Sequence, residues 1–269
     1  MLPIYLDSCM TPVKLALLHS GEEALRAKSL ARIAEHPDMA AHLAMIGRCM
    51  DLIYALLPSV KVQDANQLAL GNMGIRVFNA LAASIKLMMA GYYQASALQL
   101  RDILETIFLL DHFSTNVNLV TRWRSLSEKD RKREFKPTTV RTALDSRDGF
   151  TENRRTKAYD PLCKLAGHVT PEGFIMLIPA QHSNNVHCGP FLENRALEAT
   201  LFEAAKLATQ SANAFSTVIA NVSLDHVDAR IAFLEDSAKW FDQFFSAKTD
   251  NTKIAEMRSL LAAARSAAT

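Results

Sequence analysis

The sequence has little of what interrupts a chain or cross-links it. Glycine and proline number only nine each in 269 residues, which disfavours a β sandwich with many turns and favours long helices. The four cysteines lie far apart and form no Cys-x-x-Cys pair, so they indicate free thiols in a reducing compartment and not a disulfide framework. Hydrophobic residues make up 49% and charged residues 22% of the chain, which argues against disorder.

The sequence also shows no signal-peptide pattern and no long apolar run. The first ten residues have no basic group ahead of an apolar run, and Asp7 interrupts them. The longest charge-free stretches, 174–192 and 207–224, contain many Ser, Asn, Thr, Gln or His residues, whereas a membrane span needs about 20 mostly apolar residues. The sequence therefore predicts no signal peptide, no membrane partner and a cytoplasmic location.

Common catalytic and nucleotide-binding motifs are absent. There is no G-x-G-x-x-G or G-x-x-x-x-G-K-[ST] pattern, so neither a Rossmann turn nor a P-loop is indicated. A G-x-S-x-G elbow and the E-x-x-H pairs of a di-iron bundle are missing as well. The formal net charge of +2 gives no global field that would point to a partner.

What the sequence does have is helical periodicity. From residue 38 to 57 apolar residues recur at spacings of three and four, which predicts a helix with one buried face. Asp64 is placed to cap a helix that continues to about residue 90, where Gly91 marks a break. We predict an all-α fold, a multi-helix bundle of about eight or more helices. The chain is expected to be one domain, 1–269, with a core at 64–222 and peripheral helices at 1–60 and 224–269.

Three local features sharpen this prediction. Ser20 and Glu23 form a capping box, expected to open a helix that ends near residue 36. Pro161 lies inside the helical pattern of residues 152–168 and is expected to kink that helix or to mark its first turn. Residues 171–191, rich in glycine and proline, are expected to form an irregular loop or a short β-hairpin with a strand at 174–178.

The first candidate site residues are Arg101 and Glu105, which lie four residues apart on an otherwise apolar helix. This spacing puts both side chains on one face, partly buried, where charges need partners. They form either an ion pair that anchors a neighbouring helix or part of a site. Tyr159 and His168 lie nine residues apart and share no face of an unbroken helix, although a kink at Pro161 leaves this open. His168 suits acid–base chemistry or the stabilisation of a helix C-terminus.

Two further features bear on ligands. Five Cys and His residues gather late in the chain: Cys163, His168, His182, His187 and Cys188. Zinc prefers such ligands, although the spacings of these five match no standard zinc finger. Residues 120–164 hold thirteen Lys or Arg against seven Asp or Glu, with Trp123 between two arginines. Such a stretch suits RNA phosphates and bases, or it is a solvated helix surface with alternating charges.

The segment Gly91–Leu98 leads into Arg101–Glu105, and Tyr159–His168 follows later. This layout resembles an uncharacterised bacterial helical family near the HEPN-like superfamily (higher eukaryotes and prokaryotes nucleotide-binding). The resemblance implies a helical bundle that carries Arg and Glu on one helix and Tyr and His on a later one, and, for many relatives, RNA cleavage in toxin or defence systems. The catalytic pattern of Arg followed by His after four to six residues is absent, because Arg101 precedes His112 by eleven positions.

These observations favour a helical module that binds a small ligand or a protein partner at an internal polar site formed by Arg101, Glu105, Tyr159 and His168. The first alternative is a metal-independent ribonuclease, with His168 as acid or base and Arg101 stabilising phosphate charge. A zinc-dependent hydrolase or zinc-stabilised loop, with His168, His182, His187 and Cys188 as ligands, is the second. No cofactor is expected, and zinc enters only with the second alternative. A homo-oligomer is compatible with each interpretation.

Overall fold

The computed structural model describes residues 13–180, 188–219, 223–246 and 249–268. In this part of the chain the prediction of an all-α multi-helix bundle is confirmed, and no strand is present. The α-helices are α1 (Val13–Glu35), α2 (Pro37–Leu56), α3 (Ala65–Met89), α4 (Tyr93–Ser114), α5 (Asn118–Ser125), α6 (Glu128–Glu134), α7 (Pro137–Arg147), α8 (Arg154–Leu162), α9 (Asn194–Val218), α10 (Leu224–Phe245) and α11 (Thr252–Ala268). Short turns η1 (Leu57–Ser59), η2 (Cys163–Gly167) and η3 (Glu172–Leu177) supplement them.

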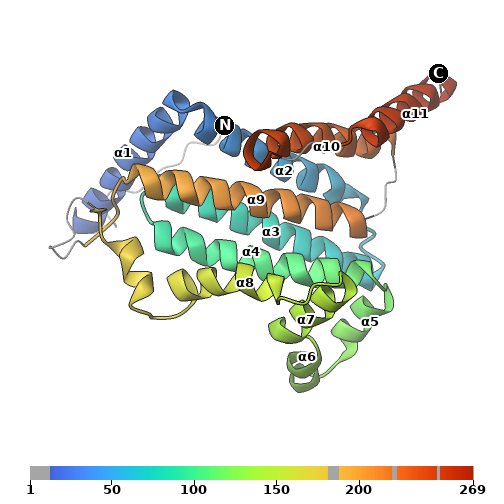
Figure 1. Ribbon diagram of the computed structural model, residues 1–269, viewed down its shortest axis with the longest axis horizontal. Coiled ribbons are helices and arrows are strands. Elements are labelled where there is room, and N and C mark those ends of the chain that lie inside the picture. Colours follow the sequence, from blue (N-terminus) through green and yellow to red (C-terminus); the bar gives the residue numbers. More distant parts are fainter. Residues whose placement is uncertain (1–12, 181–187, 220–222, 247–248, 269) are drawn as a thin grey trace.

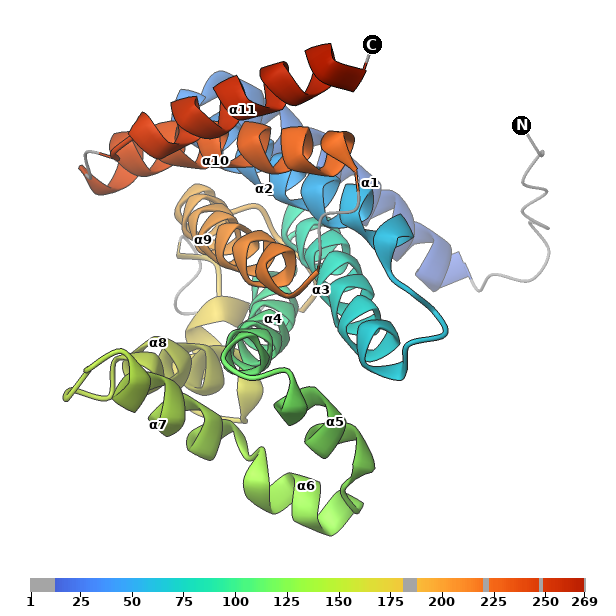
Figure 2. The ribbon, with the colours of Figure 1, turned by 90° about the vertical axis from the view of Figure 1, so that its right-hand side faces the viewer.

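Helices α2, α3, α4 and α9 form the centre of the molecule, as the end-on view shows (Figure 2). α9 packs closely because alanines dominate its buried face and Ala204, Ala205, Ala208 and Ala212 are fully buried. α10 and α11 cover the outer side of α2, while α5–α8 lie against the opposite side, below α4 (Figures 1 and 2). Residues 37–56 thus share the core expected for 64–222, with Ile46 and Ile53 completely buried.

The helix starts and stops follow local chemistry. The Asp64 carboxylate caps α3 by accepting from the backbone N–H groups of Asn66 (2.8 Å) and Gln67 (3.2 Å). The chain leaves α3 through a Schellman turn, in which Gly91 N donates to Met88 O (3.1 Å) and Tyr92 N to Leu87 O (2.9 Å). Gly91 has a φ of +87°, which a residue with a side chain adopts only at a cost.

Two local predictions are wrong. Ser20 does not cap a helix, because α1 already begins at Val13 and the Ser20 hydroxyl donates to Ala16 O one turn back (3.0 Å). The segment 174–178 is no hairpin strand, since it lies almost wholly within the 3₁₀ turn η3. Pro171 starts that turn with a fixed φ of −57°, which suits a tight helical turn better than an extended strand.

Two helical stretches, Pro37–Ser59 and Ala65–Met89, are long and apolar enough to cross a membrane by length and composition alone. Both turn buried faces towards α9, and the core helices of a bundle have the same composition. The cytoplasmic location and the lack of a membrane partner stay predictions.

Candidate functional site

Three of the four predicted site residues meet between α4 and α8. Arg101 Nη2 donates to Glu105 Oε1 (2.9 Å) and lies 2.6 Å from the Tyr159 hydroxyl. The same hydroxyl donates to Glu105 Oε1. The side chains of Arg101 and Glu105 are 25% and 29% exposed, and Tyr159 is buried. The cluster is therefore partly shielded from water, which strengthens its hydrogen bonds.

The electrostatics of this cluster keep Tyr159 protonated. Burial raises the pKa of Tyr159 well above its usual range, and its contacts with Cys163 and Glu105 raise it further. Burial alone would lower the pKa of Arg101, but the Cys163 sulfur, 3.2 Å from Arg101 Nε, and the Glu105 carboxylate raise it instead. Tyr159 thus stays protonated at neutral pH and donates a hydrogen bond to Glu105.

The helix containing Tyr159 changes character directly after Pro161. α8 ends at Leu162, and the following turn η2 is π-helical, with His168 N donating to Cys163 O (3.1 Å). Proline cannot supply a helical N–H, so the wider turn follows from its position. The structure does not bring His168 into the cluster: its side chain is exposed, and no contact of its ring with the other three residues is seen in the described part of the chain.

A cavity of about 310 Å³ lies beside Glu105, enclosed by α3, α4, α5 and the segment joining α6 to α7. Its walls are mostly apolar and aromatic, and one end is polar. The lining residues are Met73, Arg76, Asp102, Glu105, Thr106, Phe108, Leu109, Trp123, Phe135, Pro137 and Val140. Small-molecule sites have this mixture of apolar walls and a few polar groups, and their volumes start at roughly 300 Å³.

Glu105 links the cluster to this cavity. Both described hydrogen bonds to its carboxylate end on Oε1, and the residue also lines the cavity. Oε2 accepts no hydrogen bond in the part of the chain that the structure describes. Asp102, one turn away on α4, is held in a similar way, because Arg76 donates to its Oδ1. The polar end of the cavity thus offers two carboxylate oxygens, one on each residue, as acceptors.

The aromatic walls are held by a buried ring behind them. Phe113 is 2% exposed and makes edge contacts with Trp123 (ring centroids 5.9 Å apart) and Phe135 (6.1 Å). Arg131 lies over the outer face of Trp123, with its Cζ 5.7 Å from the ring centroid. Such contacts fix ring orientation, so the cavity is preformed.

Arg141 on α7 stands behind the cluster and is buried there. It is 4% exposed, its guanidinium lies 4.1 Å from the centroid of the Tyr159 ring, and Nε donates to Thr156 Oγ1 (3.3 Å). Its buried Nη1 has no hydrogen-bond partner, and no ion pair of Arg141 is seen among the described residues. A buried, unpaired cation costs free energy, so Arg141 is the least satisfied charge of the described core.

We expect Arg141→Met to stabilise the protein by about 1 kcal/mol, because an apolar side chain of similar length keeps the contact with Tyr159 and removes the desolvation cost. Urea unfolding at neutral pH measures the change. Arg124→Met, which alters an exposed arginine on α5, is the control and should change stability by less than about 0.5 kcal/mol. A loss of stability in Arg141→Met would show that the fold needs this charge.

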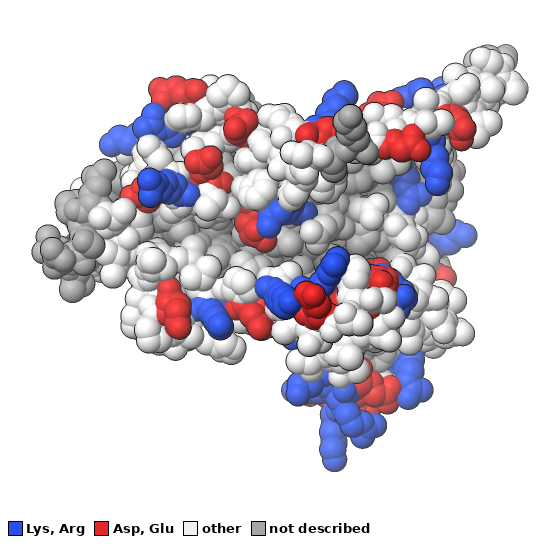
Figure 3. Space-filling model, in the orientation of Figure 1, with Lys and Arg blue, Asp and Glu red and all other residues white. Residues whose placement is uncertain are grey.

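Six of the thirteen basic residues in the stretch 120–164 form ion pairs among the described residues. Arg147 and Arg155 share Asp111 and Asp148, Arg155 also reaches Asp145 (2.9 Å), and Arg122 pairs with Glu134 (2.6 Å). Figure 3 shows blue side chains gathered on the lobe of α5 and α6, with red ones between them. This pattern is that of a surface with alternating charges, and RNA binding through the stretch stays a prediction.

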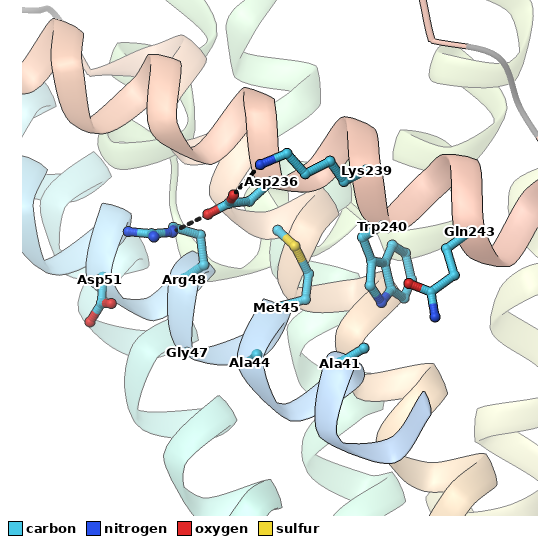
Figure 4. A pocket seen from close by; sticks show the side chains of 10 residues that line it. All are labelled: Ala41, Ala44, Met45, Gly47, Arg48, Asp51, Asp236, Lys239, Trp240 and Gln243. Carbon is cyan, nitrogen blue, oxygen red and sulfur yellow. Dashed lines mark hydrogen bonds and ion pairs between the residues drawn. The ribbon is translucent and has the colours of Figure 1, made fainter. Parts of the chain in front are cut away.

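The groove between α2 and α10 is a second hollow, of about 440 Å³ (Figure 4). Met45 and Trp240 lie in it, and small residues of α2 form one wall. Three of its charged groups satisfy one another, since Asp236 pairs with Arg48 (2.7 Å) and Lys239 (3.5 Å), whereas Asp51 makes no ion pair among the described residues.

Two of the predicted metal ligands lie outside the described residues. His182 and His187 fall in the segment that is not described, Cys188 is exposed, and Cys163 contacts Arg101. Among the described residues no group of three or more His, Cys, Asp or Glu side chains is placed to hold a metal ion. A zinc site stays a prediction.

Sequence reasoning missed the cavity. Trp123 drew attention only as an aromatic between cations, and neither Phe135 nor the Arg76–Asp102 pair was singled out. One signal was present: Phe135 and Pro137 are apolar residues directly after the charged run 128–134, as expected where a solvated helix turns back towards a core. In comparisons with protein families, curated proteins and solved structures, the chain matches none of them.

Proposed function

We propose that this chain is a helical binding module that takes a small, largely apolar ligand with a hydrogen-bond donor into the cavity beside Glu105. The observation that supports this most directly is the double role of Glu105. One oxygen of its carboxylate is held by Arg101 and Tyr159, while the side chain lines a 310 Å³ cavity with aromatic walls. Such preorganisation lowers the cost of binding.

The chemistry of the cavity selects the ligand class. Its polar end carries Asp102, Glu105 and one cation, Arg76, and Arg76 is already paired with Asp102. The Thr106 hydroxyl donates to Asp102 O (3.0 Å), so it is engaged as well. A ligand therefore meets acceptor oxygens at one end and aromatic rings elsewhere. This arrangement favours a flat molecule with N–H donors, neutral or cationic, over an anion.

Arg101 and Tyr159 act as positioning residues in this proposal. Their hydrogen bonds fix Glu105 Oε1, and the orientation of Oε2 follows from that. Tyr159→Phe removes the O–H donor and keeps the ring that lies beside Arg141 and Arg101. It should weaken ligand binding without greatly changing stability.

The test uses two nearly isosteric probes, benzamidine and benzoate. We expect the wild-type protein to bind benzamidine, measured by calorimetry and by the fluorescence of Trp123, and to bind benzoate far more weakly. Glu105→Gln should reduce benzamidine affinity by about tenfold, because it replaces a charged acceptor by a neutral one. Glutamine still accepts from Arg101 and Tyr159, so the fold is expected to persist.

Glu256→Gln is the matched control, because Glu256 is exposed on α11, away from the cavity, and it should leave affinity unchanged. Equal binding of benzoate and benzamidine, or affinity that is insensitive to Glu105→Gln, would refute the assignment of Glu105. Failure of both probes to bind the wild type, in the presence of an intact fold, would count against a ligand of this class in this cavity.

A further inference from the structure

A separate cavity of about 580 Å³ lies at the other end of α4, between η2, η3 and the first turns of α9. Its volume exceeds that of the cavity at Glu105 and that of the groove between α2 and α10. Apolar side chains make up most of its lining, and those that matter here are Leu165, Ile175, Met176, Ile178, Phe191 and Ala199. It shares no lining residue with the cavity at Glu105.

The polar atoms inside this cavity are already engaged. The Tyr93 hydroxyl donates to Glu193 O (3.3 Å) and accepts from Glu193 N (3.1 Å). The Thr200 hydroxyl donates to Ala196 O (2.6 Å). A ligand inside therefore meets no free hydroxyl of Tyr93 or Thr200, and apolar contact is the main attraction left.

The walls are fixed by a bridging side chain. Gln94 Nε2 on α4 donates both to Leu165 O in η2 (3.2 Å) and to Gly173 O in η3 (3.1 Å). Phe191 packs edge-on against Tyr93, with ring centroids 5.6 Å apart. The cavity is thus built before any ligand arrives, which reduces the entropy cost of filling it.

The segment that forms one wall exposes more apolar surface than a solvated turn requires. Val169 is 93% exposed and Ile175 71%, and Phe174, Leu177 and Ile178 are exposed as well. Clustered exposed apolar side chains mark ligand or interaction sites more often than scattered ones do. Ile175 and Ile178 also line the cavity, so the exposed patch is continuous with its interior.

Charge at the rim indicates the head group of the ligand. Arg195, in the first turn of α9, lines the cavity, and no ion pair of Arg195 is seen in the described part of the chain. The backbone of Glu193 is bound to Tyr93, and its carboxylate is the opposing charge at the rim. The first amides of α9 add partial positive charge, and Arg195 is the cation at the rim that a ligand anion could pair with.

We propose that this cavity binds a single-chain amphiphile with a carboxylate head, a fatty acid, with its chain among Leu165, Met176 and Phe191 and its carboxylate paired with Arg195. This ligand differs from the donor-bearing ligand of the cavity at Glu105. The two proposals are independent, because no side chain is common to both sites.

The experiment measures displacement of a fluorescent dansyl-labelled fatty acid from the full chain, by dodecanoic acid, dodecanol and dodecylamine below their micellar concentrations. Dodecanoic acid is expected to displace the probe best. Arg195→Ala should weaken binding of dodecanoic acid by about fivefold to tenfold and binding of dodecanol by less than about twofold, since only the acid loses a charged partner. Ala199→Trp, which fills the cavity from an exposed position of α9, should weaken all three by at least about tenfold.

Matched controls are Arg26→Ala on α1 and Ala262→Trp on α11, both at exposed positions, with circular dichroism to verify the fold of each variant. If Ala199→Trp leaves displacement unchanged, the acyl chain of the ligand binds elsewhere and the proposal is overturned. Displacement by dodecylamine equal to that by dodecanoic acid, or an Arg195→Ala effect equal for acid and alcohol, would overturn the carboxylate assignment. Glu105→Gln should leave every value unchanged.

Discussion

Gly91→Ala is expected to destabilise the protein by about 3–5 kcal/mol. Gly91 has a φ of +87°, which disfavours any residue with a Cβ. A Cβ at this position would also lie 2.4 Å from the Phe191 carbonyl oxygen and 2.7 Å from its nitrogen. These are backbone atoms, and Phe191 N donates to Gly91 O (3.4 Å), so relief requires the two segments to separate. Urea unfolding at neutral pH measures the loss.

Two other glycines allow the cost of the positive φ to be separated from the cost of the close contact with Phe191. Gly149 also has a positive φ, +69°, but a Cβ there would meet nothing within 4 Å, so Gly149→Ala should cost only about 1–2 kcal/mol. Gly47 lies inside α2 with open space around it, and Gly47→Ala should stabilise by about 0.5–1 kcal/mol. Equal losses for Gly91→Ala and Gly149→Ala would mean that the approach of Phe191 contributes nothing.

The Gly91 turn matters for the apolar cavity as well. This turn fixes where α4 begins. Tyr93 and Gln94, in the first turn of α4, hold the segments that enclose the apolar cavity. Gly91→Ala is therefore also expected to weaken binding of the fatty acid probe at temperatures where the variant remains folded. The same turn is joined to α1, where the Tyr92 hydroxyl donates to Glu22 Oε1 (2.6 Å).

The helices were predictable because their signals are local. The Asp64 cap, the break at Gly91 and the apolar spacing in α2 depend on neighbours within a few residues, and the structure has each of them. The capping box at Ser20 failed for a related reason. Its pattern is equally compatible with a helix interior, and the residues before it continue the helix.

The polar cluster was only partly predictable. The i, i+4 spacing placed Arg101 beside Glu105, but nothing local says that Tyr159, over fifty positions later, donates to the same carboxylate. That contact depends on how α8 packs on α4. The cavities are even less predictable from the sequence, because Trp123, Phe135 and Met73 meet only through the packing of separate helices. The unpaired charge of Arg141 likewise appears only once its surroundings are known.

Arg155→Met is expected to cost about 2–4 kcal/mol at neutral pH, because it leaves a buried carboxylate without its partner. Arg155 is 15% exposed and Asp145 only 6%, with Nη1 and Oδ1 2.9 Å apart. Arg155 also pairs with Asp111 (3.4 Å) and Asp148 (2.5 Å), so one substitution removes three ion pairs. Arg154→Met is the matched control on the same helix. Its guanidinium lies over the Phe150 ring, 4.5 Å from the centroid, and it should cost no more than about 1 kcal/mol.

The dependence of this loss on pH tests whether the ion pairs of Arg155 cause it. Hydrogen bonds from Arg147 and then Arg155 hold the pKa of Asp148 well below its usual range. Because the folded-state pKa is depressed, the stabilisation is complete above the unfolded pKa, about 4, and falls as the unfolded chain takes up its proton first. The difference in unfolding free energy between wild type and Arg155→Met should therefore be constant from pH 7 to about 5 and shrink towards pH 2. A difference that stays constant down to pH 2 would mean that Arg155 stabilises the fold by packing and not by its ion pairs.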